Sequence, residues 1–396
     1  MRFEKAAIPL GFAWSSPFVR WQGALAEMSS LDVAADVTRR ALDQRGLPLT
    51  EVEKLVLGWT VPQPQIFYGA PTLAARLGAE GVSGPMISQA CATSAVCVEV
   101  AAMGVEGGDG LTLVVATDRT SNGPVLLYPQ PGGMGGAPRV ENWVLDNFAR
   151  DPWAGEAMVV TAENVAREAD LSKPELDEVT LLRYEQYRRA LAAEREFQKR
   201  YLVPVAVPVS RKETRMVEED EGIHDTTAEG LAALKPVTAD GVVTFGTQTH
   251  PADGCAGAVV TTLARAHELS RGRGVARILG TGLARVEKAH MPKAPVPAAQ
   301  AALQDAGVDI KDIDAVTTHN PFAVNDLWFT RQTGYPLERM NAYGCSLVYG
   351  HPQGPTGLRL IAELIETLRE RGGGTGLFTG CAAGDTGAAV VIRVQD

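Results

Sequence analysis

Two cysteines and a histidine carry the strongest chemical signal in the sequence. Cys91 follows an apolar segment and precedes a run of small residues that predicts a helix over 93–106. A helix N-terminus carries free N–H groups and a partial positive charge, and both stabilise a thiolate. We therefore expect the pKa of Cys91 to lie below its free value near ~8.5 and the residue to act as a nucleophile. The alternative is a cysteine that only fills the core.

His351 and Cys381 have the residue types that would complete such a site. His351 lies within 349–357, where glycines and prolines on both sides fix the backbone and let the imidazole project. An imidazole accepts a thiol proton near neutral pH. Cys381 follows a predicted strand and precedes a glycine-containing loop whose amides can face an anion. A second thiol suits reversible proton delivery to a carbon acid. For His351, the alternative is a structural histidine that only packs in the protein.

The elements that must position these residues follow an α/β pattern. Short apolar runs typical of strands alternate with helical patterns, which predicts a layered α/β protein. Ser172 and Glu175 form a capping-box pattern, with Pro174 in the first turn of the helix that follows. The predicted strands are 54–58, 111–117, 257–262, 276–281, 315–318, 375–379 and 388–394, and the predicted helices are 30–45, 93–106, 173–192, 295–306 and 356–370.

Two parts of the chain repeat one order of features. Cys91 and His351 each precede a helix, a glycine turn and a buried strand, which indicates an internal duplication with converging helix N-termini. The stretch between them has Pro and Gly clusters, several Trp and Tyr, and a long polar helix. We interpret it as an inserted subdomain over the site, the alternative being a solvated insertion with no ligand role. The predicted division is 1–117 with 244–268, then 118–243, then 269–396.

Composition narrows the class of partner. The chain has 396 residues and a net charge of −10, which favours two or more packed domains and argues against nucleic acid, since phosphate binding needs a basic face. Five scattered cysteines without a C-x-x-C spacing predict reduced thiols and a cytoplasmic location, with no disulfide framework and no metal site. No apolar run reaches the ~20 residues of a membrane span, and no signal-peptide pattern is present.

The segments around Cys91, His351 and Cys381 resemble, in order and spacing, the catalytic loops of the thiolase superfamily. Segments 16–23, 161–166, 225–236 and 246–254 are also similar to stretches typical of that family, so the resemblance covers nearly the whole chain. It implies a five-layered αβαβα fold of two similar α/β halves with an inserted loop subdomain. It also implies an acyltransferase that reversibly cleaves a 3-ketoacyl-coenzyme A, or runs the reverse Claisen condensation.

The resemblance implies a role for each reactive residue. Cys91 is expected to become acylated, and His351 to activate it and help bind the thioester oxygen. Cys381 is expected to remove or return the α-proton. Backbone N–H groups of Cys91 and of the loop around Ala383 are expected to form one oxyanion hole.

The loop at 319–322 departs from the common thiolase pattern. Aligned on Phe322, the family asparagine falls at His319, as in thiolases of the sterol-carrier-protein type, although those have a cysteine where this chain has Pro321. We expect His319 to hold the water of the second oxyanion hole, with Asn320 as second choice. A histidine that merely packs at a strand end is the alternative.

Coenzyme A is implied as cosubstrate and acyl-coenzyme A as substrate, with no tightly bound cofactor. Thr249 matches a serine that contacts the pantetheine, and Arg211 and Lys212 lie where the family places a basic pair. Ordinary solvated charges are the alternative for that pair. The segment 157–159 differs from the family pattern and bears on acyl specificity, which the sequence does not define.

Two other functions stay open. One is a condensing enzyme of the same fold, similar to ketoacyl synthases or hydroxymethylglutaryl-coenzyme A synthase, which lack the second thiol that Cys381 provides. The other is an acyl-binding subunit, or a thiolase subunit that is active only with a small zinc-ribbon/OB-fold partner. The resemblance otherwise implies a homodimer or homotetramer.

Overall fold

The computed structural model describes residues 1–396 and is built around one continuous system of eleven strands. The strands are β1 (Ala6–Pro9), β2 (Ala13–Ser15), β3 (Val19–Arg20), β4 (Lys54–Gly58), β5 (Met86–Ile87), β6 (Thr112–Arg119), β11 (Ala252–Thr262), β12 (Val275–Arg285), β13 (Ala315–His319), β14 (Gly374–Ala382) and β15 (Thr386–Gln395). Their order is β13-β14-β15-β12-β1-β11-β6-β4-β5, with β2 and β3 also pairing with β11.

The two ends of this sheet system repeat the same pairing. In one half β4 is parallel to β6, which is antiparallel to β11. In the other half β13 is parallel to β14, which is antiparallel to β15. Strand β1 joins the halves, because it pairs antiparallel with both β11 and β12. The prediction of two similar α/β halves is confirmed.

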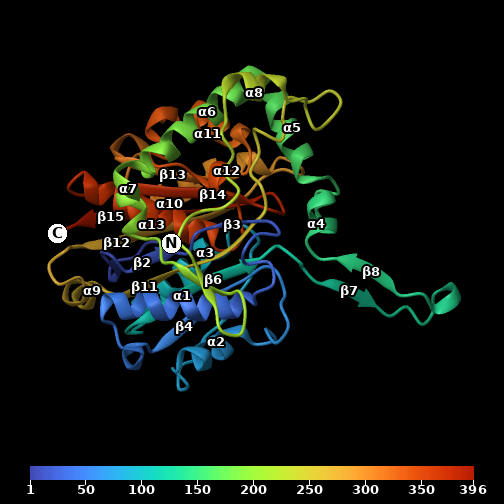
Figure 1. Ribbon diagram of the computed structural model, residues 1–396. Helices are drawn as coiled ribbons and strands as arrows, with labels where there is room; N and C mark the ends of the chain where they lie inside the picture. The colour runs from blue at the N-terminus through green and yellow to red at the C-terminus, as the bar shows by residue number, and fades with distance from the viewer.

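Helices complete five layers, αβαβα (Figure 1). Those that cover the sheets are α1 (Ser30–Arg45), α2 (Gly69–Leu77), α3 (Thr93–Glu106), α9 (Leu263–Ser270), α10 (Pro295–Ala306), α11 (Ala323–Thr333), α12 (Ser346–Tyr349) and α13 (Thr356–Glu370). Helix α1 packs on β6 and β11 from outside, and α3 packs on the same strands from inside. Helix α3 contacts α13, which lies on β13 and β14, while α10 covers β12 and β15. The central layer therefore brings α3 and α13 together.

Local sequence signals account for most helix ends. Ser29 caps α1 by accepting a hydrogen bond from the N–H of Leu31, and Gly46 ends the helix at φ 65°, a conformation that costs glycine little. The helices predicted at 30–45, 93–106, 295–306 and 356–370 are confirmed. The helix predicted at 173–192 begins with its capping box but ends at Ala190, because the residues at 193–195 have positive φ.

The segment between β6 and β11 contains the elements that lie outside the two similar halves. Its elements are β7 (Val125–Tyr128), β8 (Arg139–Asn142), α4 (Leu145–Ala149), α5 (Met158–Glu168), α6 (Lys173–Ala190), α7 (Ala192–Lys199), β9 (Val205–Pro208), β10 (Thr214–Val217) and α8 (Ala228–Ala233). Helices α5 and α6 pack against α11, whereas the β7–β8 hairpin projects away from the body (Figure 1). Short 3-10 helices lie at Leu49–Glu51, Met134–Gly136, Met291–Lys293, Ile310–Asp312 and Leu337–Arg339.

Helix α13 lies at the centre of the molecule. Every residue from 356 to 368 is buried, and its interior face carries a charged residue, Arg359. The guanidinium pairs with Asp220 and Glu363 and lies 3.6 Å from the ring centroid of Tyr349, which satisfies the buried charge. No helix of the protein combines the length and apolarity needed to cross a membrane.

Candidate active site

Cys91 lies in a tight turn at the start of α3. Ala90 has a φ of 44°, a left-handed conformation that a residue with a Cβ adopts only at a cost. The Thr93 hydroxyl holds this turn, donating to the carbonyl of Ala90 at 2.7 Å and accepting from the N–H of Gln89 at 2.8 Å. The strained turn presents Cys91 at the helix N-terminus.

The His351 imidazole contacts this thiol directly. Its Nε2 lies 3.0 Å from the Cys91 sulfur, although the two residues are 260 positions apart. Its Nδ1 lies 2.7 Å from the hydroxyl oxygen of Thr356, the first residue of α13. When Nδ1 carries the ring proton and donates a hydrogen bond to the Thr356 hydroxyl, Nε2 is free to accept the thiol proton. The two helices of the central layer thus bring the pair together.

Burial sets the protonation state of the pair. It raises the pKa of the Cys91 thiol to about 12, although the N–H groups of Ala383 and of Cys91 itself act in the opposite direction. Burial and the neighbouring His319 lower the pKa of His351 well below its ordinary value. The expected lowering of the Cys91 pKa is therefore wrong, because desolvation outweighs the helix N-terminus. The resting pair is a neutral thiol hydrogen-bonded to a neutral imidazole.

His319 stacks on His351. Their ring centroids are 4.1 Å apart, and Nδ1 of His319 bonds the hydroxyl of Ser346 at 2.9 Å. Its Nε2 is buried and has no hydrogen-bond partner in the protein. An unpartnered buried nitrogen costs ~1–3 kcal/mol, which a water or a substrate oxygen would recover. Burial lowers the pKa of His319 to about 3, so this ring is also neutral.

Asn320 lies in a second polar group, which the Ser346 hydroxyl joins to that of His319 by donating to the Asn320 side-chain oxygen at 3.4 Å. Its amide donates to Asp326 at 2.6 Å, and the same carboxylate forms a buried ion pair with Arg183 at 2.8 Å. The side chain is fully buried in this cluster. The structure thus brings His319, and not Asn320, into contact with His351, while the likeness of this loop to sterol-carrier-protein-type thiolases stays a prediction.

Cys381 is buried at the end of β14. Asn325 donates its amide N–H to the Cys381 sulfur at 3.2 Å. Burial and the nearby Cys91 raise the pKa of the Cys381 thiol above its ordinary value, and the Asn325 bond opposes this shift. The residue is therefore a neutral thiol that can give a proton and whose anion has a donor in place.

The Ala383 loop is anchored from two sides. Asp385 accepts hydrogen bonds from the N–H group of Ala289 at 2.9 Å and from that of His290 at 3.0 Å. Asp151 of the inserted segment accepts from the N–H of Gly384 at 3.0 Å. The Ala383 N–H, which faces the Cys91 sulfur, thus has a fixed direction, as an oxyanion donor requires.

The residues expected at coenzyme A lie at two different places. Thr249 donates its hydroxyl proton to the carbonyl of Ser346 at 2.5 Å, and its N–H donates to the carbonyl of Pro321 at 2.7 Å. It therefore links the two loops that flank His319. Arg211 and Lys212 are exposed between β9 and β10 and form no ion pair.

Three supporting residues were not expected from the sequence. Asn325 bonds Cys381 and Thr356 bonds His351, and each lies within six residues of His319 or His351, which was the available signal. The third is Asp118, a buried carboxylate at the end of β6. It accepts from the N–H of Thr60 at 2.7 Å and of Gly354 at 2.8 Å, so it ties the His351 loop to the other half.

Two groups of metal-type donor atoms are present, where the sequence predicted none. In the first, the sulfur of Cys91 and nitrogens of His319 and His351 lie within 4.8 Å of one another, and zinc accepts such ligands. Cys91 and His351 already bond each other, so this pair is satisfied without an ion. The second, exposed group consists of Glu168, Glu287 and His290. The Lys293 ammonium lies 2.6 Å from one of its carboxylates and 2.5 Å from the other.

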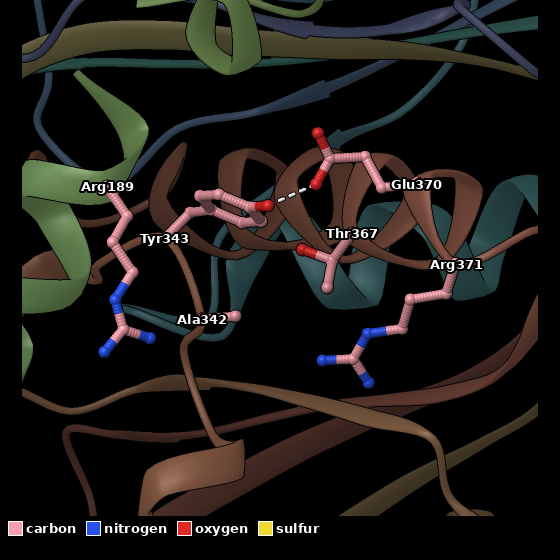
Figure 2. Close-up of a pocket in the computed structure, with 6 residues that line it drawn as sticks. All are labelled: Arg189, Ala342, Tyr343, Thr367, Glu370 and Arg371. Atoms are coloured by element: carbon pink, nitrogen blue, oxygen red, sulfur yellow. Dashed lines mark hydrogen bonds between the residues drawn. The ribbon is translucent and has the colours of Figure 1, made fainter. Parts of the chain in front are cut away.

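A separate depression of about 500 Å³ lies beside α6 and the end of α13 (Figure 2). It is lined by Arg189, Ala342, Tyr343, Thr367, Glu370 and Arg371. The hydroxyl of Tyr343 donates to Glu370 across it. It contains neither a thiol nor an imidazole, so it has no groups for acyl transfer.

A thiol paired with an imidazole is an arrangement that can form and release an acyl-cysteine, which places the protein among enzymes with a nucleophilic cysteine. The family description "Thiolase, N-terminal domain" matches residues 13–264, and "Thiolase, C-terminal domain" matches residues 273–394. The chain therefore belongs to the thiolase family of acyltransferases.

Individual relatives agree with this assignment. An acetyl-CoA acetyltransferase of Escherichia coli (strain K12) is 31% identical over 380 residues, which cover 94% of this chain and 95% of the relative. One from Chromobacterium violaceum is 29% identical over 383 residues, with the same coverage. The crystal structure of the Bacillus anthracis acetyl-CoA acetyltransferase has a TM-score of 0.91 at 27% identity, covering 99% of both chains. Human mitochondrial 3-ketoacyl-CoA thiolase, at 24% identity and a TM-score of 0.90, shares the fold.

Proposed function

We propose that Cys91 carries the acyl group in the reversible cleavage of a 3-ketoacyl-coenzyme A by coenzyme A. The observation that carries the proposal is the 3.0 Å contact between the Cys91 sulfur and Nε2 of His351. A neutral imidazole beside a neutral thiol is the arrangement that general-base activation needs. Cys381, with its Asn325 donor, supplies the second proton-transfer group.

In the first half-reaction the sulfur of Cys91 attacks the 3-keto carbon, and its proton moves to Nε2 of His351. The bond between C2 and C3 breaks, and the electron pair stays on C2 as the enolate of acetyl-coenzyme A. Cys381 gives its proton to C2. In the second half-reaction the Cys381 thiolate takes the proton of coenzyme A, whose sulfur attacks the acyl carbon. Cys91 leaves and regains its proton from His351.

Two oxyanion holes would stabilise the charges that develop. The N–H groups of Cys91 and Ala383 would bind the former ketone oxygen, since both act on the Cys91 sulfur. The protonated His351 and a water on the free Nε2 of His319 would bind the thioester oxygen of the enolate. Removal of one such donor typically costs ~10²–10³ in rate.

Coenzyme A is the cosubstrate of this proposal, with no tightly bound cofactor. Arg211 and Lys212 would bind its phosphates, which is supported by their exposure and their lack of ion-pair partners. Thr249 would contact the pantetheine, which is supported by its hydrogen bonds to both loops beside His319. The division into 1–117 with 244–268, 118–243 and 269–396 belongs to the same proposal, with the middle part as the cover over the thioester.

The test is acylation of the isolated chain by acetyl-coenzyme A, read by mass spectrometry, together with thiolysis of acetoacetyl-coenzyme A. We expect the acyl group on Cys91 alone, its loss in Cys91→Ser, and strongly reduced thiolysis in Cys381→Ala. Cys97→Ala is the matched control, because Cys97 is a buried thiol of α3 outside the catalytic pair. Acylation at another residue, or normal turnover in Cys91→Ser, would contradict the proposal.

The same experiment separates the alternatives. A condensing enzyme would be acylated but would not cleave acetoacetyl-coenzyme A. Acylation and turnover by the isolated chain would exclude a requirement for a zinc-ribbon/OB-fold subunit. Activity that appears only after a partner is added would support that requirement.

We also propose a homodimer or homotetramer in which the β7–β8 hairpin is covered by a second copy. An isolated two-stranded hairpin is marginally stable in water, and exposed apolar side chains mark a contact surface. This hairpin exposes Val125, Leu127 and Val140, and Met134 at its tip. Light scattering should show an oligomer for the wild type and a smaller species for Leu127→Asp; a wild-type monomer would refute this.

We propose the cytoplasm as the location of the protein, which is supported by its five free thiols.

A further inference from the structure

A pocket of about 390 Å³ lies directly beside the loops that carry Cys91 and Ala383. Ala90 and Ala383 line its inner side, and these are the residues next to Cys91 and in the oxyanion loop. The inserted segment forms the opposite wall, with Trp143, Val144, Phe148 and Pro152. An acyl group attached to Cys91 therefore has this pocket next to it.

The wall formed by Trp143, Val144, Phe148 and Pro152, called the aromatic wall below, is held in position by hydrogen bonds. The indole N–H of Trp143 donates to the carbonyl of Thr60 at 2.8 Å. The Asn147 amide donates to the carbonyl of Trp143 at 2.8 Å and to Glu141 at 3.1 Å. Thr60 in turn is fixed by buried Asp118. The wall is thus pre-organised for a ligand, which lowers the entropy cost of binding.

The size and charge of the pocket restrict the acyl group. A dry cavity of about 150 Å³ is enough for benzene, so 390 Å³ far exceeds the needs of an acetyl methyl group. No lysine, arginine or histidine lines it, and its two ionisable groups are the carboxyls of Glu141 and Asp151. Arg139 pairs with Glu141 at 3.7 Å but does not line the pocket, so a carboxylate on the acyl chain would meet like charge and no cation within the pocket. Trp143 and Phe148 are half-buried and offer ring surfaces for stacking.

We propose that this pocket receives the distal part of the acyl group and selects bulky, uncharged 3-ketoacyl thioesters, in particular those with a ring that packs on Trp143. The inference rests on the proposed thiolase function and names its substrate class. Trp143 and Phe148 are then specificity-determining residues, and neither takes part in the chemical steps.

The test compares kcat/KM for thiolysis of 3-oxo-5-phenylpentanoyl-coenzyme A with that of acetoacetyl-coenzyme A. We expect the phenyl substrate to be preferred, and the ratio to fall at least about tenfold in Trp143→Ala and in Phe148→Ala, as loss of a large apolar contact implies. Trp153→Ala is the matched control. Trp153 belongs to the same segment but does not line the pocket. Its ring centroid lies 4.2 Å from Cζ of Arg285.

A second comparison tests charge. Thiolysis of 3-oxohexanoyl-coenzyme A should exceed that of 3-oxoadipyl-coenzyme A, which has the same chain length and a terminal carboxylate. Equal kcat/KM for all substrates, preference for acetoacetyl-coenzyme A, or an equal effect of Trp153→Ala would overturn the pocket assignment while leaving the thiolase proposal intact. If no thioester acylates Cys91, the proposed function itself fails. Thermal unfolding of each variant separates a loss of folding from a loss of selectivity.

Discussion

Thr356→Val tests whether the hydroxyl next to His351 supports proton transfer. The hydroxyl oxygen lies 2.7 Å from Nδ1, and both side chains are buried. Valine keeps the shape of threonine but removes the acceptor, so the imidazolium that forms when Cys91 loses its proton has no partner on that side. A hydrogen bond to a charged group contributes ~1.5–3 kcal/mol, which corresponds to roughly 10- to 150-fold in rate.

The assay is the single-turnover rate of Cys91 acylation, measured by rapid quench and mass spectrometry. Acylation should slow by that factor in Thr356→Val, and the pH profile should shift because the charged form of His351 is less stable. Thr356→Ser restores the hydroxyl and should restore the rate, which a purely structural role of the methyl group would not explain. An acylation rate in Thr356→Val equal to that of the wild type would refute the assigned tautomer.

Three further predictions follow from the same contacts. Asn325→Ala removes the donor to the Cys381 thiolate and should slow both turnover and the acylation of Cys91 by acetyl-coenzyme A by ~10-fold or more, because both steps form that thiolate; unchanged rates in quenched-flow measurements would contradict this. Arg359→Met leaves Asp220 buried without its counter-ion and should lower the free energy of unfolding by ~3–5 kcal/mol in denaturant titrations; an unchanged midpoint would argue against the ion pair. Burial raises the pKa of Asp118 to about 7, so the folded state keeps a proton that the unfolded chain releases near pH ~4. Stability should therefore fall as pH rises between these values, and Asp118→Asn should flatten this slope in thermal unfolding; parallel profiles would contradict it.

Local signals in the sequence were sufficient for much of the fold. Four of the five predicted helices have the predicted bounds, because caps, glycine ends and apolar periodicity act over a few neighbouring residues. The fifth ends at Ala190, two residues earlier than predicted and shortly before residues 193–195, which adopt positive φ although none of them is glycine. The repeated helix, glycine turn and strand after Cys91 and His351 corresponds to the α3–β6 and α13–β14 units of the two halves. A pattern with a short range in sequence is readable without the tertiary structure.

The electrostatic state of the site was not readable in this way. A helix N-terminus next to Cys91 predicted a lowered pKa, but the tertiary structure surrounds the half-buried Cys91 with protein, and the resulting desolvation raises the pKa of its thiol to about 12. The same burial keeps His319 and His351 neutral. Desolvation depends on which distant segments cover a group, and no local pattern contains that information.

The sequence by itself determined which residue types carry the chemistry and which secondary structure elements hold them. Only the tertiary structure decided that Cys91 and His351 touch across 260 residues, that His319 and not Asn320 stacks on the imidazole, and that Trp143 and Phe148 line a pocket together with Ala90 and Ala383. The physical reason is range: helix propensity and capping act between near neighbours, whereas contact, burial and pocket shape arise from packing of segments far apart in the chain.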